Sequence, residues 1–331
     1  VAQPAIRHSF VKNLRAIPRP FVALTGLLLA SAIVSTVISA QLEVSLGILK
    51  GWVIVPILAG LLVYNRSRSS KRTYDLLLDT LVAAGSVTAL LSLTQLQFGE
   101  RLAGIYDVPN SLALWLAPLI TLAAMRIVVD RRRGYILPVI VMATALVLAQ
   151  SLAGVLVVIL ALSLAGVLWS PRPLLAAGVL IFFVVAGVGV LQNSQSSQAS
   201  YAVRQQLWSV GTDLVQQQPI LGIGLGQFEP HYQRVLHERF ARYNSGESDQ
   251  SPLPEFVFRD PHNWPLAWWL NLGLTGLFSF IGLHVIVFRH SRDRSVTIAL
   301  VCLLLFGLVD TIYWKNDPAA VHWMLLLLAL P

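Results

Sequence analysis

A histidine and a group of arginines between residues 192 and 264 are the side chains best suited to chemistry. His262 and Asn263 precede an apolar stretch, where Asp260 can cap a helix and Pro265 allows a later start. A helix N-terminus disfavours a charged imidazole and favours a nearby anion. A neutral imidazole beside an anion can act as a general base. The alternative is an interfacial histidine without a chemical role.

Arg204 is the single cation within residues 201–217, where apolar residues recur at helical spacing. A guanidinium group can hold a phosphate through two parallel N–H groups. More arginines follow in the same polar segment, at Arg234, Arg239, Arg242 and Arg259. A bound anion accounts for this excess of cations. Pairing with nearby glutamates, or contact of Arg204 with lipid headgroups, is the alternative.

Two further polar groups flank apolar stretches and are candidates for a supporting role. Arg101 and Asn110 precede the stretch at 110–129, although Asn110 also suits a helix start. Asp310 and Lys315 lie near the end of the stretch at 296–313. A carboxylate at membrane depth is a functional candidate, unless Asp310 and Lys315 form only a local pair. No histidine, cysteine or carboxylate spacing indicates a metal site, and we expect no cofactor.

The composition shows which kind of scaffold must position these residues. Of 331 residues, 56% are hydrophobic and 12% are charged, with a mean hydropathy of +0.68. Soluble domains carry about 25% charged residues. Apolar runs near 20 residues suit membrane-spanning helices and not β-barrel strands. The net charge of +8 does not indicate nucleic-acid binding in such a chain, because the placement of the charges matters more than their sum.

We therefore expect an all-α, polytopic transmembrane bundle of about ten spans with one long extracytoplasmic loop. The chain divides into N-terminal helices at 1–191, with about seven spans, the loop at 192–264 and about three C-terminal spans at 265–331. The expected spans are 20–40, 45–64, 77–98, 110–129, 135–150, 152–169, 174–191, 265–288, 296–313 and 319–331. The fifth and sixth are short, and a single long helix is the alternative there.

Charge placement supports this count and gives an orientation. With the N-terminus inside, the short cytoplasmic loops hold most of the 24 lysines and arginines, while most acidic residues lie outside. Merging the fifth and sixth spans would move the basic cluster at 289–294 to the outer face. Span interiors are almost uncharged, which argues against an ion-coupled transporter. The single cysteine, Cys302, excludes an internal disulfide.

The loop itself is predicted to contain two helices. An amphipathic helix covers 201–217 and ends at Pro219, and a second covers 228–242. The glycines at 222, 224 and 226 do not indicate a dinucleotide site, since no strand precedes them. They predict a close-packed turn, and a backbone cradle for phosphate is the alternative.

Together these features resemble the superfamily of O-antigen ligases and Wzy-type polymerases. Arg204 and Trp208, the PILGIGLGQF stretch at 219–228, and Pro261, His262 and Asn263 carry the resemblance most densely. Further matching motifs are Gly273 with Gly276, Arg101 with Gly104, Pro109 with Asn110, and residues 310–317.

The resemblance implies an inverting, metal-independent glycosyltransferase that assembles lipopolysaccharide or another polysaccharide at the outer face of the bacterial inner membrane. Its donor would be a glycan on undecaprenyl diphosphate, and its acceptor a lipid core, a protein or another glycan. Arg204 would contact the diphosphate, and His262 would act as base or orient the acceptor hydroxyl. A second arginine would share the diphosphate, for which we choose Arg234, with Arg239 in reserve. One or two N-terminal spans are expected to be missing.

Three functions stay open at this point: a glycosyltransferase, a flippase and a non-catalytic scaffold. The glycosyltransferase is either a ligase or a polymerase, which use the same residues, and the sequence does not separate them. A flippase for lipid-linked glycans would need a polar path through the spans. A non-catalytic scaffold would tolerate substitution of His262 and Arg204.

Overall fold

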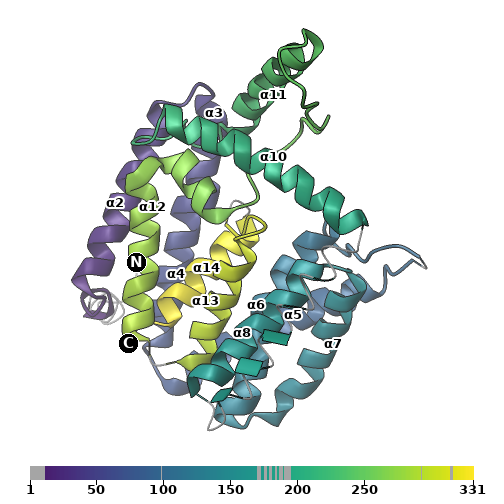
Figure 1. The fold of residues 1–331 in the computed structure, drawn as a ribbon. Helices are drawn as coiled ribbons and strands as arrows, with labels where there is room; N and C mark the ends of the chain where they lie inside the picture. Colours follow the sequence, from purple (N-terminus) through teal and green to yellow (C-terminus); the bar gives the residue numbers. More distant parts are fainter. Residues whose placement is uncertain are drawn as a thin grey trace.

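The computed structural model describes residues 12–97, 99–169, 195–291, 293–313 and 316–331, with isolated positions between 173 and 189 (Figure 1). Every regular element within these residues is a helix. Among them, six helices are long and apolar enough to cross a membrane. They are α2 (Arg19–Val37), the combined helix Leu42–Ser67, α5 (Lys71–Leu93), α6 (Pro109–Asp130), α8 (Leu152–Trp169) and α12 (Trp264–His290).

Three shorter apolar helices complete the described part of the bundle. They are α7 (Ile136–Leu148), which follows the 3-10 turn η2 (Arg133–Tyr135), α13 (Arg294–Phe306) and α14 (Asn316–Leu328). The expected fifth and sixth spans are two separate helices, α7 and α8, joined by a tight turn in which Gln150 takes a φ of 49°. The expected span at 174–191 lies largely outside the described residues.

The combined helix is not uniform, which the sequence did not indicate. It consists of α3 (Leu42–Ile48), a π-helix η1 (Leu49–Ile54) and α4 (Val55–Ser67). A π-helical stretch is rare and is often found beside a functional site.

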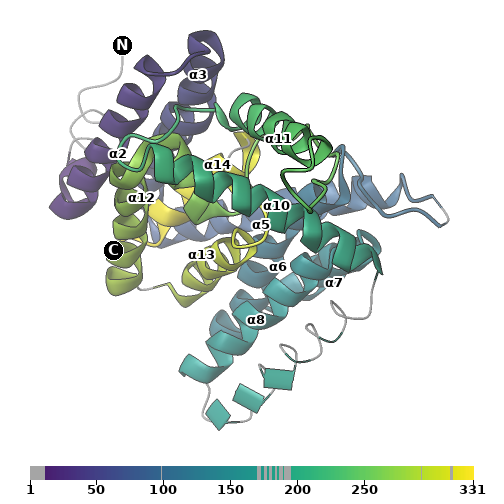
Figure 2. The ribbon, with the colours of Figure 1, turned by 45° about the horizontal axis from the view of Figure 1, so that its top comes forward.

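Helices from the two ends of the sequence pack side by side. In Figures 1 and 2, α2 lies beside α12 and α14 beside α4, and α13 packs against both α6 and α8. One cluster of buried side chains joins both halves, from Phe21 and Leu28 to Trp268 and Trp323. The helices that follow residue 264 therefore stand within the bundle formed by the earlier ones.

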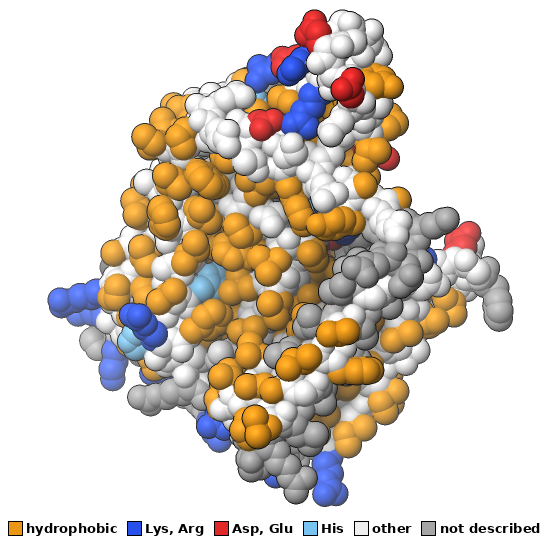
Figure 3. Space-filling model, in the orientation of Figure 1, with side chains coloured by type: hydrophobic (Ala, Val, Ile, Leu, Met, Phe, Trp, Pro, Cys, Tyr) orange, Lys and Arg blue, Asp and Glu red, His pale blue; other side chains and the backbone are white. Residues whose placement is uncertain are grey.

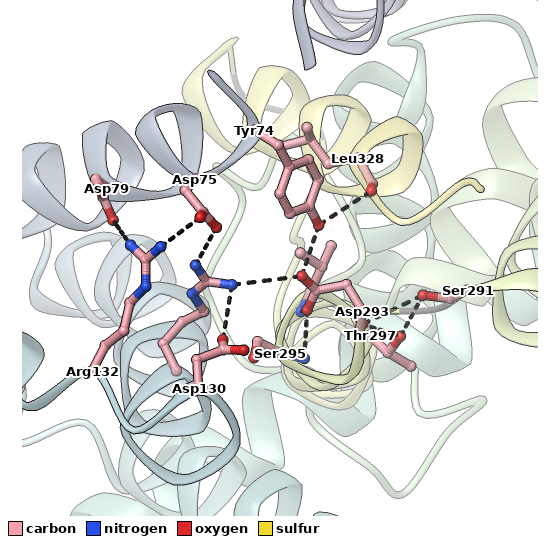
Figure 4. A network of polar contacts seen from close by, with 12 residues as sticks. Tyr74, Asp75, Asp79, Asp130, Arg132, Ser291, Asp293, Ser295, Thr297 and Leu328 are labelled. Carbon is pink, nitrogen blue, oxygen red and sulfur yellow. Dashed lines mark hydrogen bonds and ion pairs between the residues drawn. The ribbon is translucent and has the colours of Figure 1, made fainter. Parts of the chain in front are cut away.

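A network of charged side chains ties three helices together at one end of the bundle (Figure 4). Arg126 is only 4% exposed and contacts the carboxylates of Asp75 at 2.6 Å, Asp130 at 2.8 Å and Asp293 at 3.8 Å. Arg132 also binds Asp75, at 2.5 Å. These contacts bring the start of α5, the end of α6 and the start of α13 to the same end. This grouping agrees with the alternating topology expected from the sequence.

The other end carries a helical cap, which we define as α10 (Gln195–Gln217), α11 (Phe228–Asn244) and residues 245–263. The cap has its own small core, which includes Leu207, Leu214, Tyr232 and Leu236. Both helices expected in the loop are present. Figure 3 shows acidic and basic side chains over the cap, hydrophobic side chains across the middle of this face, and Lys and Arg at its lower edge.

The expected span at 265–288 is present as α12, but this helix is broken at Gly273, which has a φ of 67°. Residues 219–226 pack against this break, where the amide of Ile223 donates to the Leu270 carbonyl at 2.8 Å. A Cβ on Gly273 would lie 1.9 Å from the Ile220 carbonyl oxygen. Glycines 222, 224 and 226 all take positive φ. The glycine stretch is therefore the expected close-packed turn, and its partner is the broken helix.

Candidate functional site

His262 lies at the entrance to α12 in a backbone conformation that is unusual for its type. Its φ of 49° is left-handed, and such residues outside glycine cluster at functional sites. Asp260 does not cap the helix as expected; its carboxylate accepts the backbone N–H of His262 at 2.9 Å. The cap is Asn263, which accepts the amide of Leu266 at 3.0 Å. The helix thus begins at Trp264, the later of the two expected starts.

The loop that follows α13 supports this entrance. The amide of Trp264 donates to the Gly307 carbonyl at 2.7 Å, and the side chain of Asn263 donates to the Leu308 carbonyl at 3.0 Å. The sequence predicted a span continuing to residue 313, but α13 ends at Phe306. The residues after it, 307–311, contact the His262 loop, and we call them the seat.

Two carboxylates face the imidazole from this seat and from the His262 loop. Nδ1 of His262 lies 3.1 Å from Oδ1 of Asp310 and 3.6 Å from Oδ1 of Asp260. Asp260 also accepts a hydrogen bond from the hydroxyl of Thr311. Asp310 is 5% exposed, so its carboxylate is shielded from water. The hydrogen bond to Asp310 assigns the proton to Nδ1 and leaves Nε2 with its lone pair.

The carboxylates also decide the protonation equilibrium of His262. Burial alone would lower the pKa of His262, and nearby Arg204 lowers it further. The charges of Asp260 and Asp310 and the hydrogen bond to Asp310 outweigh both effects, so the pKa of His262 lies above its ordinary value. This differs from the sequence-based expectation, in which a helix dipole acting alone held the imidazole neutral.

Arg204 reaches the same place from α10. Its Nε donates to the carbonyl of Val309 at 2.7 Å, directly before Asp310, and its Nη1 donates to Ser200. Since its charge lowers the pKa of His262, it lies within electrostatic range of the imidazole. The structure therefore brings together Arg204, His262 and Asp310, which three separate parts of the chain supply.

The two arginines considered as further phosphate ligands differ in their surroundings. Arg239 pairs with Asp213 at 2.7 Å and donates to Ser209 at 3.0 Å, which fastens α11 to α10. Arg234 is exposed on α11, and the described residues give it no hydrogen bond or ion pair. Of the two, only Arg234 has its donors uncommitted. Lys315 lies outside the described residues.

Arg101 and Asn110 meet, but at a separate place in the same end of the bundle. Nη2 of Arg101 lies 3.3 Å from the side-chain oxygen of Asn110, and the guanidinium also donates to the carbonyls of Ala149 and Gln150. This arginine therefore closes the turn between α7 and α8. The loop before α6 is linked to the start of α14 by the hydroxyl of Tyr106, which donates to Asp317 at 2.8 Å.

Sequence reasoning missed two partners of the site. Asp260 was considered only as a helix cap, although aspartate side chains often accept the backbone N–H two residues further along, which could have indicated its contact with the amide of His262. The Val309 carbonyl carries no side-chain signal, so nothing in the sequence marks it as the acceptor for Arg204.

Comparison with known proteins gives a family match for part of the chain. No curated protein matches the chain. The matching part extends from α7 into α12, includes Arg204, Arg234, Arg239 and His262, and ends before Asp310. Residues 137–281 match the family model described as O-antigen ligase, so this region of the chain is similar to that family.

Proposed function

We propose that this chain is a membrane glycosyltransferase that transfers a glycan from undecaprenyl diphosphate to a lipid, protein or glycan acceptor. The observation that carries the proposal is the meeting of Arg204 and His262 at the Val309–Asp310 seat. These two residues come from the cap and from the entrance to α12. The family match over residues 137–281 supports a lipid-linked glycan as substrate.

The arrangement suits an inverting transfer with His262 as general base. Nε2 of His262 takes the proton from an acceptor hydroxyl, whose oxygen attacks the anomeric carbon of the donor glycan. The bond between that carbon and the diphosphate oxygen breaks, and the electron pair leaves with the diphosphate. Arg204, with Arg234 as second cation, neutralises the leaving group, while Asp310 orients the imidazole and stabilises its charged form.

The proposed location is the outer face of the bacterial inner membrane. Six apolar helices support a multi-pass membrane protein, and the basic loops at the end opposite the cap support an inward orientation of that end. The cap and His262 would then face outward, where no nucleotide-activated sugar is available. A lipid-linked donor fits this compartment.

The test is transfer from a synthetic undecaprenyl-diphosphate oligosaccharide by the purified protein, with and without EDTA. We expect His262→Ala to lose roughly 10²–10⁴-fold in rate, because a positioned base contributes that much. Arg204→Ala should lose roughly 10²–10³-fold, as for one electrostatic contact to a developing charge. The exposed cap residue Arg242 is the matched control, and Arg242→Ala should transfer at the wild-type rate.

Full activity in His262→Ala would refute the base assignment, and an EDTA-sensitive reaction would refute metal independence. Ligase and polymerase are separated by the product gel. A product that needs an added lipid-core acceptor identifies a ligase, and a ladder formed without it identifies a polymerase.

A further inference from the structure

The carboxylate of Asp260 is held in one place by contacts with two other residues. Its Oδ1 accepts the backbone N–H of His262 at 2.9 Å and the hydroxyl of Thr311, and it lies 3.6 Å from Nδ1 of the His262 ring. The side chain of Asp260 is 13% exposed, so water competes little for these contacts. The position of this carboxylate is therefore set by the fold.

Thr311 connects this carboxylate to the one on the seat. Its hydroxyl donates to Oδ1 of Asp260, and its backbone N–H donates to Oδ1 of Asp310 at 2.7 Å. Thr311 itself is 0% exposed. One buried residue thus places both carboxylates beside the same ring nitrogen, Nδ1 of His262.

The contact with Asp260 also bears on the backbone of His262. The left-handed φ of 49° at His262 is a conformation that a residue other than glycine keeps only where its surroundings hold it. Two bonds fasten the loop to the seat around this residue. Asp260 binds Thr311 before His262, and Asn263 donates to the carbonyl of Leu308 after it. Of the two, only the first involves a group that also faces the imidazole.

The two carboxylates act on the imidazole in different ways. Three charged groups influence His262, which are Asp260 on its own loop, Asp310 on the seat and Arg204 on α10. Asp310, at 3.1 Å, accepts the hydrogen bond from Nδ1, whereas 3.6 Å is too long for a hydrogen bond from Asp260 to the ring. Asp260 therefore supplies a charge to the ring and an acceptor oxygen to the backbone, and an asparagine would keep only the oxygen.

We infer that Asp260 is a positioning residue for His262, and that its bond to Thr311, which we call the latch, keeps the His262 loop in the geometry that transfer requires. The inference rests on the proposed function, since it concerns the base of that reaction. Asp260 acts through His262 and not by touching substrate. Its oxygen holds the backbone N–H, and its charge stabilises the imidazolium that forms once Nε2 has taken the proton of the acceptor hydroxyl.

Two substitutions at Thr311 test the latch. Thr311→Val removes the hydroxyl and keeps almost the same shape, whereas Thr311→Ser keeps the hydroxyl. We expect Thr311→Val to lower kcat about tenfold, because the loop loses its fixed geometry, while the donor KM stays within about twofold because Arg204 is unchanged. Thr311→Ser should retain kcat within about twofold of the wild type.

Two substitutions at Asp260 separate its oxygen from its charge. Asp260→Asn keeps the acceptor oxygen, so kcat at high pH should stay within about threefold, but the midpoint of kcat/KM should move to lower pH because one charge that favours imidazolium is gone. Asp260→Ala also removes the oxygen, so its kcat should fall about tenfold as well. Glu255→Gln removes a carboxylate from an exposed position on the same segment of the cap, and this matched control should change neither quantity.

The titration of His262 is also measured without turnover, by NMR of the full chain in detergent with ¹³C-labelled histidine. The signal that is missing from His262→Gln identifies this residue among the seven histidines. Asp260→Asn should lower the titration midpoint of this signal, whereas Glu255→Gln should leave it in place.

An unchanged His262 midpoint in Asp260→Asn would overturn the inference, as would equal kcat in Thr311→Val and Thr311→Ser. Variants that lose thermal stability but keep the wild-type midpoint and kcat would show a merely structural role, which also contradicts it. Each of these results leaves the proposed function standing if transfer still requires His262. Conversely, a wild-type protein without transferase activity, in which Asp260→Asn still shifts the His262 midpoint, would reject the proposed function and keep the action of Asp260 on the imidazole.

Discussion

At the residue scale, His262 is placed to act as a base, but its surroundings favour its protonated form. Its Nδ1 faces Asp310 at 3.1 Å and Asp260 at 3.6 Å, and both carboxylates favour the imidazolium form. A raised pKa makes Nε2 a stronger base, but it also keeps more of the histidine protonated at neutral pH. The left-handed backbone at His262 fixes this geometry before any substrate binds.

This arrangement predicts a pH profile. Since only neutral His262 accepts a proton, kcat/KM should rise with pH, with a midpoint above the ordinary histidine pKa of about 6.5. Asp310→Asn removes a charge that favours imidazolium, so the midpoint should move to lower pH while the maximal rate falls roughly 10²-fold or more through lost orientation. The measurement is kcat/KM between pH 5 and 9.

Asp249→Asn, in an exposed part of the cap, is the control and should leave the profile unchanged. A midpoint that stays in place in Asp310→Asn would mean that Asp310 does not act on His262.

At the element scale, the break in α12 joins the cap to the bundle. The amide of Leu274 donates to the Pro219 carbonyl, Trp269 donates to the same oxygen, and Asn271 accepts the amide of Gly226. Backbone groups released by the break are thus satisfied by the glycine turn. This is how a helix can be interrupted at membrane depth without leaving polar groups unpaired.

A side chain at the break should therefore be costly. Gly273→Ala requires a positive φ from alanine and places a Cβ against Ile220, so we expect the midpoint of thermal aggregation in detergent to fall by at least about 5 °C. Gly26→Ala in α2 is the matched control, because a Cβ there meets nothing within 4 Å. Equal stability of the two variants would show that residues 219–226 do not depend on this glycine.

The sequence predicted these elements unevenly, for physical reasons. Long apolar runs, apolar residues at helical spacing and prolines indicate where helices occur. The helices α10, α11, α7 and α8 could therefore be predicted. The break at Gly273 could not, because an isolated glycine in an apolar run is also tolerated inside a helix. The residues that pack against the break lie some fifty residues earlier, and the sequence around Gly273 does not indicate that contact.

At the scale of the whole molecule, two polar ends enclose an apolar middle. The cap, which lies at the top of Figure 3, and the His262 centre occupy one end, and the network around Arg126 occupies the other. The basic loops of the sequence correctly predicted that the charged residues of this network lie on the same face. That Arg126 would be buried among three aspartates could not be predicted, since the pairing depends on how α5, α6 and α13 pack.

The orientation has a direct test, because the natural cysteine is buried. Cys302 is 0% exposed and should not react with a membrane-impermeant maleimide. In spheroplasts, Ser245→Cys in the cap should be labelled, whereas Ser69→Cys at the opposite end should be labelled only after lysis. The reverse labelling pattern would show that the protein has the opposite orientation in the membrane, and it would reject an outward-facing reaction centre.

The length of α12 beyond its break also indicates how deep in the membrane the break lies. Residues 274–290 span roughly 25 Å at 1.5 Å per residue, less than the hydrocarbon thickness of about 30 Å. With the far end of α12 at the inner boundary, the break falls just within the outer one. The half-helix Trp264–Leu272 turns back from there into the bundle, because the ring of Trp264 lies 5.3 Å from the ring of Phe280 and its amide donates to the carbonyl of Gly307. The start of α12, next to His262, therefore lies below the outer boundary, and a diphosphate that reached His262 would have to enter the bundle from the headgroup layer.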